Sequence, residues 1–292
     1  MQFMRAKDGS ASRTEPTDEE RMIKKSILFA AAFALLAGPA YAAKCSNSGS
    51  GFEAFKKDFA QYARSQGVGK RGINALMSTK YSPGVIKFDR RVNRAFRKAA
   101  SSSGSFQRFY AKKTKGLAPI TKRKLRQHKR LFDSIERNYG VQREVLASIW
   151  GMETGFGRFT GKHDIVTSLA TLTHDCRRSG FFRPNLLAAL KIIDNGWVSR
   201  KNMRGARHGE IGQTQFMAAN YIRYGVDYDG NGRRDLIRST ADVLASTANY
   251  LRQKGWQPMG SYQPGTRNFN VLHEWNASSA YQRTIAKFAA SL

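Results

Sequence analysis

The sequence predicts one mainly α-helical domain with minor β content. Apolar and aromatic residues recur at spacings of three and four along much of the chain, which is the period of an amphipathic helix. Strand-like segments do not alternate with helical ones, so a βαβ sheet is not indicated, and the sequence shows no internal repeat. With 292 residues, 41% of them hydrophobic and 11% aromatic, the chain has enough apolar material for one sizeable core or two small ones.

The N-terminal region has the pattern of a secretory signal. Residues 22–25 (MIKK) are a short basic start, residues 26–38 are an apolar run, and residues 40–42 (AYA) fit a small-x-small cleavage site. We interpret residues 22–42 as a signal peptide because the apolar run is too short to span a bilayer, with a transmembrane anchor as the alternative. The sequence therefore predicts an exported protein with no stable membrane anchor, and a Gram-negative periplasm as its compartment.

The remaining N-terminal segments complete the predicted organisation. Residues 1–21 are polar and precede the signal, so we interpret them as an extension foreign to the natural protein, with Met22 as the true start. Residues 43–51 are rich in serine and glycine and are expected to form a flexible lead-in. The folded domain is predicted to cover residues 52–292.

The chain is strongly basic, with 50 lysines and arginines, 21 acidic residues and a net charge of +29. Cleavage after Ala42 would remove six basic and five acidic residues and leave +28. Such a surface attracts nucleic acid, anionic lipid or acidic wall polymers, or is a basic solvated surface with no dedicated partner. Export argues against nucleic acid, and Lys122–Arg130 lacks the interleaved aromatic residues typical of nucleic-acid binding.

The first predicted elements follow the apolar periodicity from Phe52 onward. A helix with one aromatic face, more typical of a core than of a ligand site, is predicted from four residues: Phe52, Phe55, Phe59 and Tyr62. Residues 101–105 (SSSGS) are expected to form a loop. Lys122–Arg137 reads as one basic helix, with Thr121 as a candidate N-cap.

Later elements are bounded by glycines and caps. An apolar helix face is predicted from five residues: Val141, Val145, Leu146, Ile149 and Met152. This helix is expected to end at Glu153, because Gly155 and Gly157 follow. Leu186–Ile193 predicts another buried helix. Ser239 and Asp242 resemble a capping box that opens a helix ending near Gly255.

The two cysteines, Cys45 and Cys176, are an even pair in a chain predicted to be exported. An oxidising compartment favours a disulfide, which would tie the mature N-terminus to the middle of the domain. Two free thiols are the alternative. Lys44 before Cys45 does not fit a lipoprotein, so no lipid is expected on Cys45.

Glu153 is the first candidate for chemistry. It follows Trp150 and Met152 and precedes Phe156, and desolvation in apolar surroundings raises the pKa of a carboxyl group. A raised pKa is what a general acid for glycosidic cleavage requires. An ordinary helix-end glutamate capped by nearby amides is the alternative.

The string around Glu153 resembles the catalytic signature of the B-type lytic murein transglycosylases. Residues 149–157 (IWGMETGFG) carry this match. Further blocks resemble the family in order: residues 168–172, 175–178, 181–182, 209–216 with Tyr221, 226–232, 246–251, 255–256 and 275–278. The resemblance runs from about Phe52 to Leu292, and several blocks at consistent spacing make it highly specific.

The resemblance implies a lysozyme-like, α-rich domain with a single catalytic carboxylate and no required cofactor. Glu153 would protonate the oxygen between N-acetylmuramic acid and N-acetylglucosamine, then take the proton of the muramic C6 hydroxyl, which closes a 1,6-anhydro ring without water. Ordinary glycosidases need two carboxylates, and neither Asp164 nor Asp175 has a spacing that makes it face Glu153. A hydrolase would need one of them to hold a water.

The same blocks imply the residues that contact substrate. Gln215 and Asn276 are expected to hydrogen-bond the saccharide, and Tyr221 and Phe181 to pack on sugar rings. Two arginines, Arg177 and Arg178, are expected to meet the peptide stem or to hold the groove wall. Core packing of Phe181 and Phe182, and a solvated arginine pair, are the alternatives. Two departures from the family are Ala206, where members often carry serine, and Trp275, where some carry tyrosine.

The segment after residue 226 resembles part of an EF-hand calcium loop. Positions 1, 3, 5, 6 and 9 of such a loop match Asp227, Asp229, Asn231, Gly232 and Asp235. Position 12 should be a bidentate glutamate but is Arg238. A calcium site at Asp227, Asp229, Asn231 and Asp235 is therefore expected to be weak, and a structural turn without an ion is the alternative.

A second function class stays open at this point. A non-catalytic peptidoglycan-binding protein of the same fold would use the positive charge and the groove but would not need the acid in its full string. The sequence does not define endo or exo cleavage, the preferred stem peptide, the oligomeric state or any protein partner.

Overall fold

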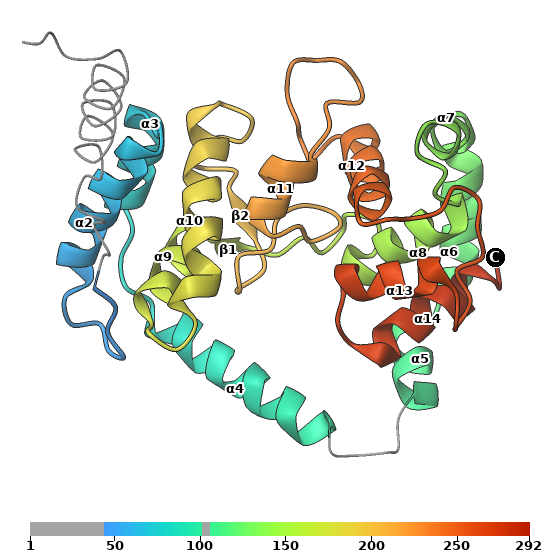
Figure 1. The fold of residues 1–292 in the computed structure, drawn as a ribbon, viewed down its shortest axis with the longest axis horizontal. Coiled ribbons are helices and arrows are strands. Elements are labelled where there is room, and N and C mark those ends of the chain that lie inside the picture. Colours follow the sequence, from blue (N-terminus) through green and yellow to red (C-terminus); the bar gives the residue numbers. More distant parts are fainter. Residues whose placement is uncertain (1–43, 101–105) are drawn as a thin grey trace, which may run out of the picture. The chain divides into compact units, whose positions relative to one another are not determined.

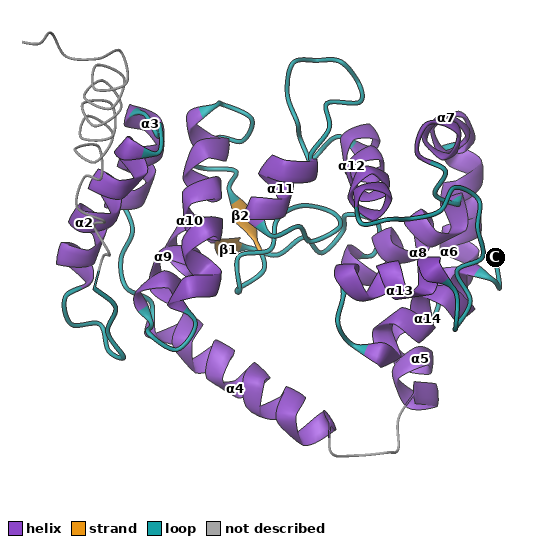
Figure 2. Cartoon of the chain, viewed as in Figure 1, coloured by secondary structure: helices purple, strands orange, loops and turns teal. Residues whose placement is uncertain are grey.

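The computed structural model describes residues 44–100 and 106–292, with side chains described except at 95–100. The predicted extension and signal peptide, and the loop predicted at 101–105, lie outside these ranges. Within them the fold is mainly α-helical with one small sheet, as predicted (Figure 2). No helix in this part of the chain is long and apolar enough to cross a membrane.

Thirteen helices and two strands make up the described residues. In chain order they are α2 (Phe52–Ser65), α3 (Lys70–Met77), α4 (Pro83–Ala100), α5 (Phe106–Thr114), α6 (Leu117–Gln127), α7 (Lys129–Tyr139), α8 (Arg143–Thr154), β1 (His163–Asp164), α9 (Ile165–His174), α10 (Ser179–Asp194), β2 (Arg204–Gly205), α11 (Ala218–Tyr224), α12 (Thr240–Gln253), α13 (Arg267–Trp275) and α14 (Ser279–Ala289). The strands pair antiparallel, with His163 opposite Gly205 and Asp164 opposite Arg204.

One group of helices packs around α10, which contacts α3, α9 and α11 (Figure 1). The predicted aromatic face of α2 points into this group, since Phe52, Phe55 and Phe59 are buried and Tyr62 is partly buried against them. The buried helix predicted at Leu186–Ile193 is the central part of α10. The long helix α4 packs against α9 at its start.

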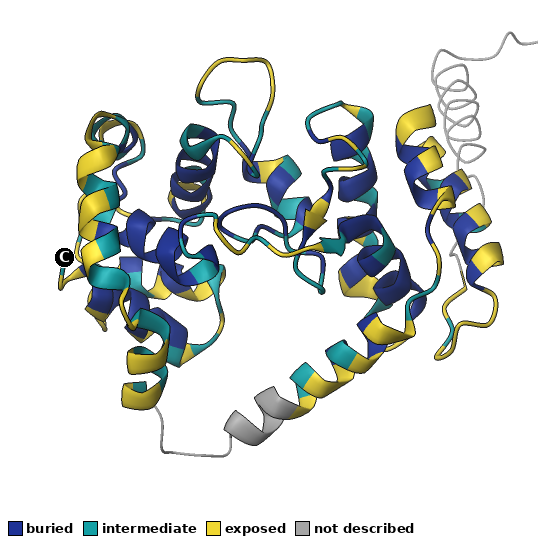
Figure 3. Cartoon of the chain, turned by 180° about the vertical axis from the view of Figure 1, so that it is seen from behind, coloured by how far each residue is buried: buried dark blue, intermediate teal, exposed yellow. Residues whose placement is uncertain are grey.

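A second group is built around α8. This helix contacts α6, α7, α12 and α14, and α14 also contacts α5 (Figure 1). The predicted apolar face of α8 is confirmed, because Val145, Leu146 and Ile149 have no exposed surface. The inward faces of the helices are buried in both groups (Figure 3). Their buried side chains form one continuous apolar cluster. Its largest buried side chains include Trp150 and Trp256.

The end of α8 is set by backbone conformation. Gly155 has φ 59°, a left-handed conformation that ends the helix, and its amide donates to the Gly151 carbonyl. Phe156 (φ 64°) and Gly157 (φ 84°) continue the turn. A Cβ atom on Gly157 would lie 2.7 Å from Gln213 Oε1, so a side chain there would need rearrangement of the loop. The turn leaves Glu153 in the last turn of α8.

The helix predicted over Lys122–Arg137 is wrong in its boundaries. The structure divides it into α6 and α7, with His128 between them. Thr121 lies inside α6, where its hydroxyl donates to the Leu117 carbonyl, so it is not an N-cap. A run of basic residues carries no local signal for the break at His128.

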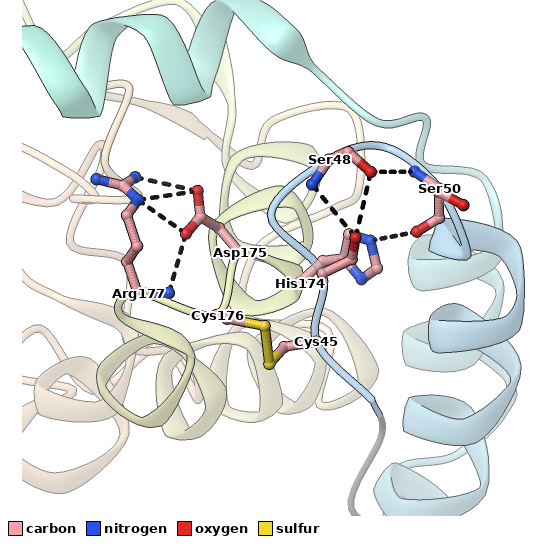
Figure 4. Close-up of a disulfide and its surroundings, with 8 residues drawn as sticks. Cys45, Ser48, Ser50, His174, Asp175, Cys176 and Arg177 are labelled. Carbon is pink, nitrogen blue, oxygen red and sulfur yellow. Dashed lines mark hydrogen bonds and ion pairs between the residues drawn. A yellow bond between two sulfur atoms is a disulfide. The ribbon is translucent and has the colours of Figure 1, made fainter.

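The structure joins Cys45 and Cys176 in a disulfide, with Cα atoms 4.9 Å apart (Figure 4). The neighbouring lead-in is held against the end of α9. The Ser46 amide donates to the His174 carbonyl at 2.8 Å, and His174 Nε2 lies 3.0 Å from the Ser50 carbonyl oxygen. The lead-in predicted to be flexible is therefore fixed at both ends.

Candidate active site

The central cleft lies where the two helix groups meet and has a volume of about 340 Å³. Its lining side chains come from the end of α8, the start of α10, the loop from β2 to α11, and helices α11, α12 and α13. They are Glu153, Arg178, Phe181, Phe182, Ala206, His208, Glu210, Gln215, Phe216, Met217, Asn220, Tyr250, Trp275 and Asn276. The cleft thus gathers residues from segments more than 100 positions apart.

Glu153 is held in the cleft through one of its carboxylate oxygens. Tyr281 donates its hydroxyl to Glu153 Oε1 at 2.5 Å, and the Trp275 indole donates to the same oxygen at 3.3 Å. Both donors come from the C-terminal helices. Because Oε1 accepts two hydrogen bonds from the protein, the acid form of Glu153 carries its proton on Oε2.

The surroundings raise the pKa of Glu153. Desolvation by burial is the largest cause, and it is opposed by the Tyr281 hydrogen bond, the charge of Lys113 and the Trp275 hydrogen bond. Lys113 also lies over the Tyr281 ring, with Nζ 5.7 Å from the ring centroid. The raised pKa agrees with the expectation from the apolar helix, whereas the opposing donors come from residues far away in sequence.

We predict that Tyr281→Phe lowers kcat/KM about 10- to 100-fold, since a hydrogen bond to a charged group contributes about 1.5–3 kcal/mol. Loss of the hydroxyl removes an influence that lowers the pKa of Glu153. The alkaline limb of the pH profile, where the acid form disappears, should therefore move to higher pH. Rates on isolated peptidoglycan across pH would measure this.

Tyr224→Phe is the matched control, because Tyr224 is a buried tyrosine that does not line the central cleft. Its pH profile should match the unaltered protein. An alkaline limb that stays in place in Tyr281→Phe would show that this hydroxyl does not tune Glu153.

Four of the predicted substrate residues line the central cleft with Glu153: Gln215, Asn276, Phe181 and Arg178. Gln215 has a left-handed backbone (φ 57°), and its side-chain amide donates to the Thr160 and Gly212 carbonyls. Phe181 is 51% exposed and offers a ring to a ligand. Phe182 is buried, so the core alternative holds for it and not for Phe181.

The structure does not place Tyr221 where it was predicted. Its side chain has no exposed surface and does not line the central cleft, so it cannot stack on a sugar. The hydroxyl donates to the Arg234 carbonyl, and the ring stacks on Trp197. Tyr221 is therefore a core residue that packs beneath the loop containing Arg234.

Arg177 also lies off the cleft lining. It is bound by Asp175, with its Nε 3.0 Å from Oδ1, and by the buried Asp89, with Nη2 2.8 Å from Oδ2. Arg178 donates to the other oxygen of Asp89 at 2.9 Å and lies over the Phe181 ring. The arginine pair was predicted either to meet the peptide stem or to hold the groove wall. The ion pairs of Arg177 with Asp175 and Asp89 favour the second role for this residue.

Neither aspartate considered from the sequence reaches the cleft. Asp164 caps α9 through the Thr167 amide and pairs with Arg200, and Asp175 pairs with Arg177. Glu210 does line the cleft. Glu210 lies in the block 209–216, where no local signal distinguishes it from an ordinary loop residue.

The acidic loop after α11, residues 227–238, does not bring together the four residues that were predicted to bind calcium. Asp227 and Asp229 come together with Asp242 of α12, each offering an oxygen within 4.8 Å of the others. Asp235 instead accepts the amides of Ile237 and Arg238 through Oδ1. Asp242 was predicted to share a capping box with Ser239, whose hydroxyl does cap α12.

The Asp242 carboxylate accepts amides from the acidic loop, so it does not complete the capping box. Oδ1 is 2.8 Å from the Tyr228 amide and Oδ2 is 2.7 Å from the Asp235 amide. Asn231 Oδ1 accepts the Arg233 amide. Asp242 of α12 therefore supplies a carboxylate in place of the glutamate that the predicted loop lacks at its twelfth position.

Comparison with known proteins identifies one family for most of the chain. A family model described as a transglycosylase SLT domain matches residues 51–265. The chain is 36% identical, over 119 residues, to membrane-bound lytic murein transglycosylase B of Escherichia coli K12. That segment is 40% of this chain and 33% of the relative, so the match spans a third of that protein's length.

Solved structures agree over most of the chain. SltB3 from Pseudomonas aeruginosa, in complex with NAG-NAM-pentapeptide, superposes with a TM-score of 0.74 at 26% identity, covering 83% of this chain and 80% of that one. The Escherichia coli lytic transglycosylase Slt35, in complex with calcium, has a TM-score of 0.70 at 19% identity, covering 87% and 96%. The latter likeness concerns the fold alone.

Proposed function

This chain belongs to the transglycosylase SLT domain family, and we propose that it is a peptidoglycan lytic transglycosylase with Glu153 as its acid and base. Its substrate would be the bond between N-acetylmuramic acid and N-acetylglucosamine in glycan strands. The single observation that carries this is the placement of Glu153 in the central cleft, with a raised pKa and with Oε1 held by Tyr281 and Trp275.

In the first step Glu153 donates the proton on Oε2 to the glycosidic oxygen as the bond to the muramic anomeric carbon breaks. Burial favours the protonated form before the reaction, and the Tyr281 and Trp275 donors stabilise the carboxylate that forms. The acetamido group of the substrate supplies the nucleophilic assistance that a second carboxylate gives in other glycosidases.

In the second step the Glu153 carboxylate accepts the proton of the muramic C6 hydroxyl. The hydroxyl oxygen attacks the anomeric carbon and displaces the acetamido oxygen that bonded to it in the first step, which restores the acetamido group and forms the 1,6-anhydro ring, and Glu153 returns to its acid form. The two steps need no water, because the C6 oxygen takes the place of the glycosidic oxygen on the anomeric carbon and Glu153 regains the proton that it donated. Gln215 and Asn276 hydrogen-bond the saccharide, and Phe181 and Arg178 pack along it at the start of α10.

Mass spectrometry of soluble products from purified sacculi tests this proposal. Anhydro-muropeptides are the expected products of residues 43–292. Reducing-end products would identify a hydrolase, and binding to sacculi without any product would identify a non-catalytic wall-binding protein.

We also propose that the protein acts after export to a periplasm. The Cys45–Cys176 disulfide supports this, since disulfides persist in oxidising compartments. The basic composition suits an acidic wall polymer. Fractionation of cells that express the full chain would locate it, and retention in the cytoplasm with residues 1–42 uncleaved would contradict export.

The acidic loop fits a calcium ion, which the chemistry of Glu153 does not require. Asp227, Asp229 and Asp242 offer three carboxylate oxygens, and burial together with the charge of Asp229 raises the pKa of Asp242. A cation would relieve this repulsion, and oxygen ligands are those that calcium prefers. A bound ion would hold the loop to α12.

We expect calcium to raise the thermal midpoint. Free calcium at about ten times its dissociation constant adds about 1.4 kcal/mol, or about 3–6 °C for a domain of this size. Differential scanning calorimetry would measure the shift, which Asp229→Asn should reduce and Asp235→Asn should leave. An equal midpoint with calcium and with chelator would make the loop a turn without an ion.

A further inference from the structure

Glu210 is a second carboxylate in the central cleft. It lies in the loop between β2 and α11, whereas Glu153 lies at the end of α8, and both line the same hollow. The side chain of Glu210 is 28% exposed, so part of it is open to a ligand in the cleft. Desolvation by burial and, to a smaller extent, the charge of Glu153 raise the pKa of Glu210, so the two carboxylates lie within electrostatic range of each other.

One oxygen of this carboxylate has no partner. Oε2 is buried, and no donor in residues 44–94 and 106–292 hydrogen-bonds it. A buried acceptor left without a hydrogen bond costs about 1–3 kcal/mol, and more when it is charged. Desolvation by burial accordingly raises the pKa of Glu210. No contact of Oε2 within the described residues offsets this cost.

The backbone amides of Glu210 and His208 lower the pKa of the Glu210 carboxyl group, but the groups beside it leave Oε2 without a hydrogen bond. His208 Nδ1 lies 4.0 Å from Oε1, too far for a hydrogen bond, and His208 Nε2 lies 3.2 Å from the buried Asp89. Arg178, also held by Asp89, lowers the pKa of Glu210 through its charge. Glu153 and Arg178 are thus the charged groups that act on Glu210, and the titratable side chain of His208 lies beside it.

We propose that Glu210 is a saccharide-binding residue whose carboxylate accepts a hydrogen bond from the N-acetylhexosamine bound in the central cleft. The donor is an acetamido N–H or a ring hydroxyl, the two donor types that such a sugar carries. This inference rests on the proposed function, because it needs a glycan in the cleft. Glu210 positions the sugar, while Glu153 remains the residue that moves protons.

The thermal stability of Glu210 variants distinguishes a role in saccharide binding from a role in the fold. A carboxylate that costs folding free energy and serves binding should leave the fold as stable or more stable when it is replaced by an amide. A structural acceptor should lower the thermal midpoint when it is replaced. The Glu210→Gln variant keeps the shape of the side chain and removes the charge.

Isothermal calorimetry with a soluble GlcNAc-MurNAc-peptide is the direct test, in a Glu153→Gln background that prevents turnover. Adding Glu210→Gln should weaken binding about three- to tenfold, and adding Glu210→Ala about 10- to 100-fold, since hydrogen bonds to charged groups exceed neutral ones. Glu53→Gln is the control, because Glu53 is an exposed carboxylate on α2 outside the cleft. It should bind as the parent does.

A de-N-acetylated form of the same ligand identifies the donor. If Glu210→Gln has a different effect on this probe, the donor is the nitrogen at C2, and if the effect is equal, the donor is a hydroxyl. Binding within twofold of the parent in both Glu210 variants would overturn the inference and leave the proposed function standing. A Glu210→Gln midpoint well below the parent would also overturn it, in favour of a structural role. A parent that binds no muropeptide would overturn both.

Discussion

Glu153→Gln is expected to reduce the release of soluble products from sacculi about 10³–10⁴-fold, at the upper end of what a general acid and base contributes. The amide retains the shape of the side chain and can still accept the Tyr281 and Trp275 hydrogen bonds on Oε1. It has no proton to give to a glycosidic oxygen. Binding to sacculi should remain, because the rest of the central cleft is unchanged.

The fold of this variant should be at least as stable at neutral pH. A carboxyl whose pKa is raised in the folded protein binds more protons folded than unfolded, so its contribution to stability falls as pH rises through that window. An amide removes this loss. Glu144→Gln, in the first turn of α8 and away from the cleft lining, is the matched control and should keep full activity. Product release by Glu153→Gln near the normal rate would exclude it as the catalyst.

Replacing both Cys45 and Cys176 by alanine is expected to lower the free energy of unfolding by about 2–5 kcal/mol. The bond joins residues 131 positions apart, so it removes much chain freedom from the unfolded state. It also lies two residues from Arg178, on the wall of the central cleft. Urea denaturation with and without reductant would measure the change.

The unaltered protein under reductant is the internal control for this pair. It should lose about as much stability as the double variant, which should itself be insensitive to reductant. Equal unfolding free energies for oxidised, reduced and doubly substituted protein would show that the bond contributes nothing to the fold.

Local patterns in the sequence were sufficient to predict the helix that carries Glu153. The apolar face of α8, the two glycines behind it and the apolar neighbours of Glu153 are all within about twelve residues, and helix ends are decided at that range. The cysteine pair was also predictable, because only two cysteines exist in a chain with a signal-like start.

Contacts between distant segments were not predictable in this way. The hydrogen bond from Tyr281 to Glu153 joins residues 128 positions apart, and nothing near Tyr281 distinguishes it from a core tyrosine. Tyr221 shows the opposite error, since its block matched a groove but tertiary packing buried its ring. An aromatic residue fits either place, and only the packing of other helices decides between them.

The acidic loop shows why spacing alone misassigned a ligand. A pattern counted along the chain reached Arg238 at the twelfth position, whereas the structure brings Asp242 to the cluster from α12. Glu210 was missed for the same reason, because its burial in the central cleft depends on loops that meet only in the folded chain.

Digestion of sacculi in water enriched with oxygen-18 tests most directly whether Glu153 drives cleavage without water. The mechanism proposed here takes the new bond to the anomeric carbon from the muramic C6 oxygen, so the products should be anhydro-muropeptides that carry no heavy oxygen. Products that carry one heavy oxygen at a reducing end would contradict it and would make the protein a hydrolase, with Glu210 as the carboxylate to hold the water.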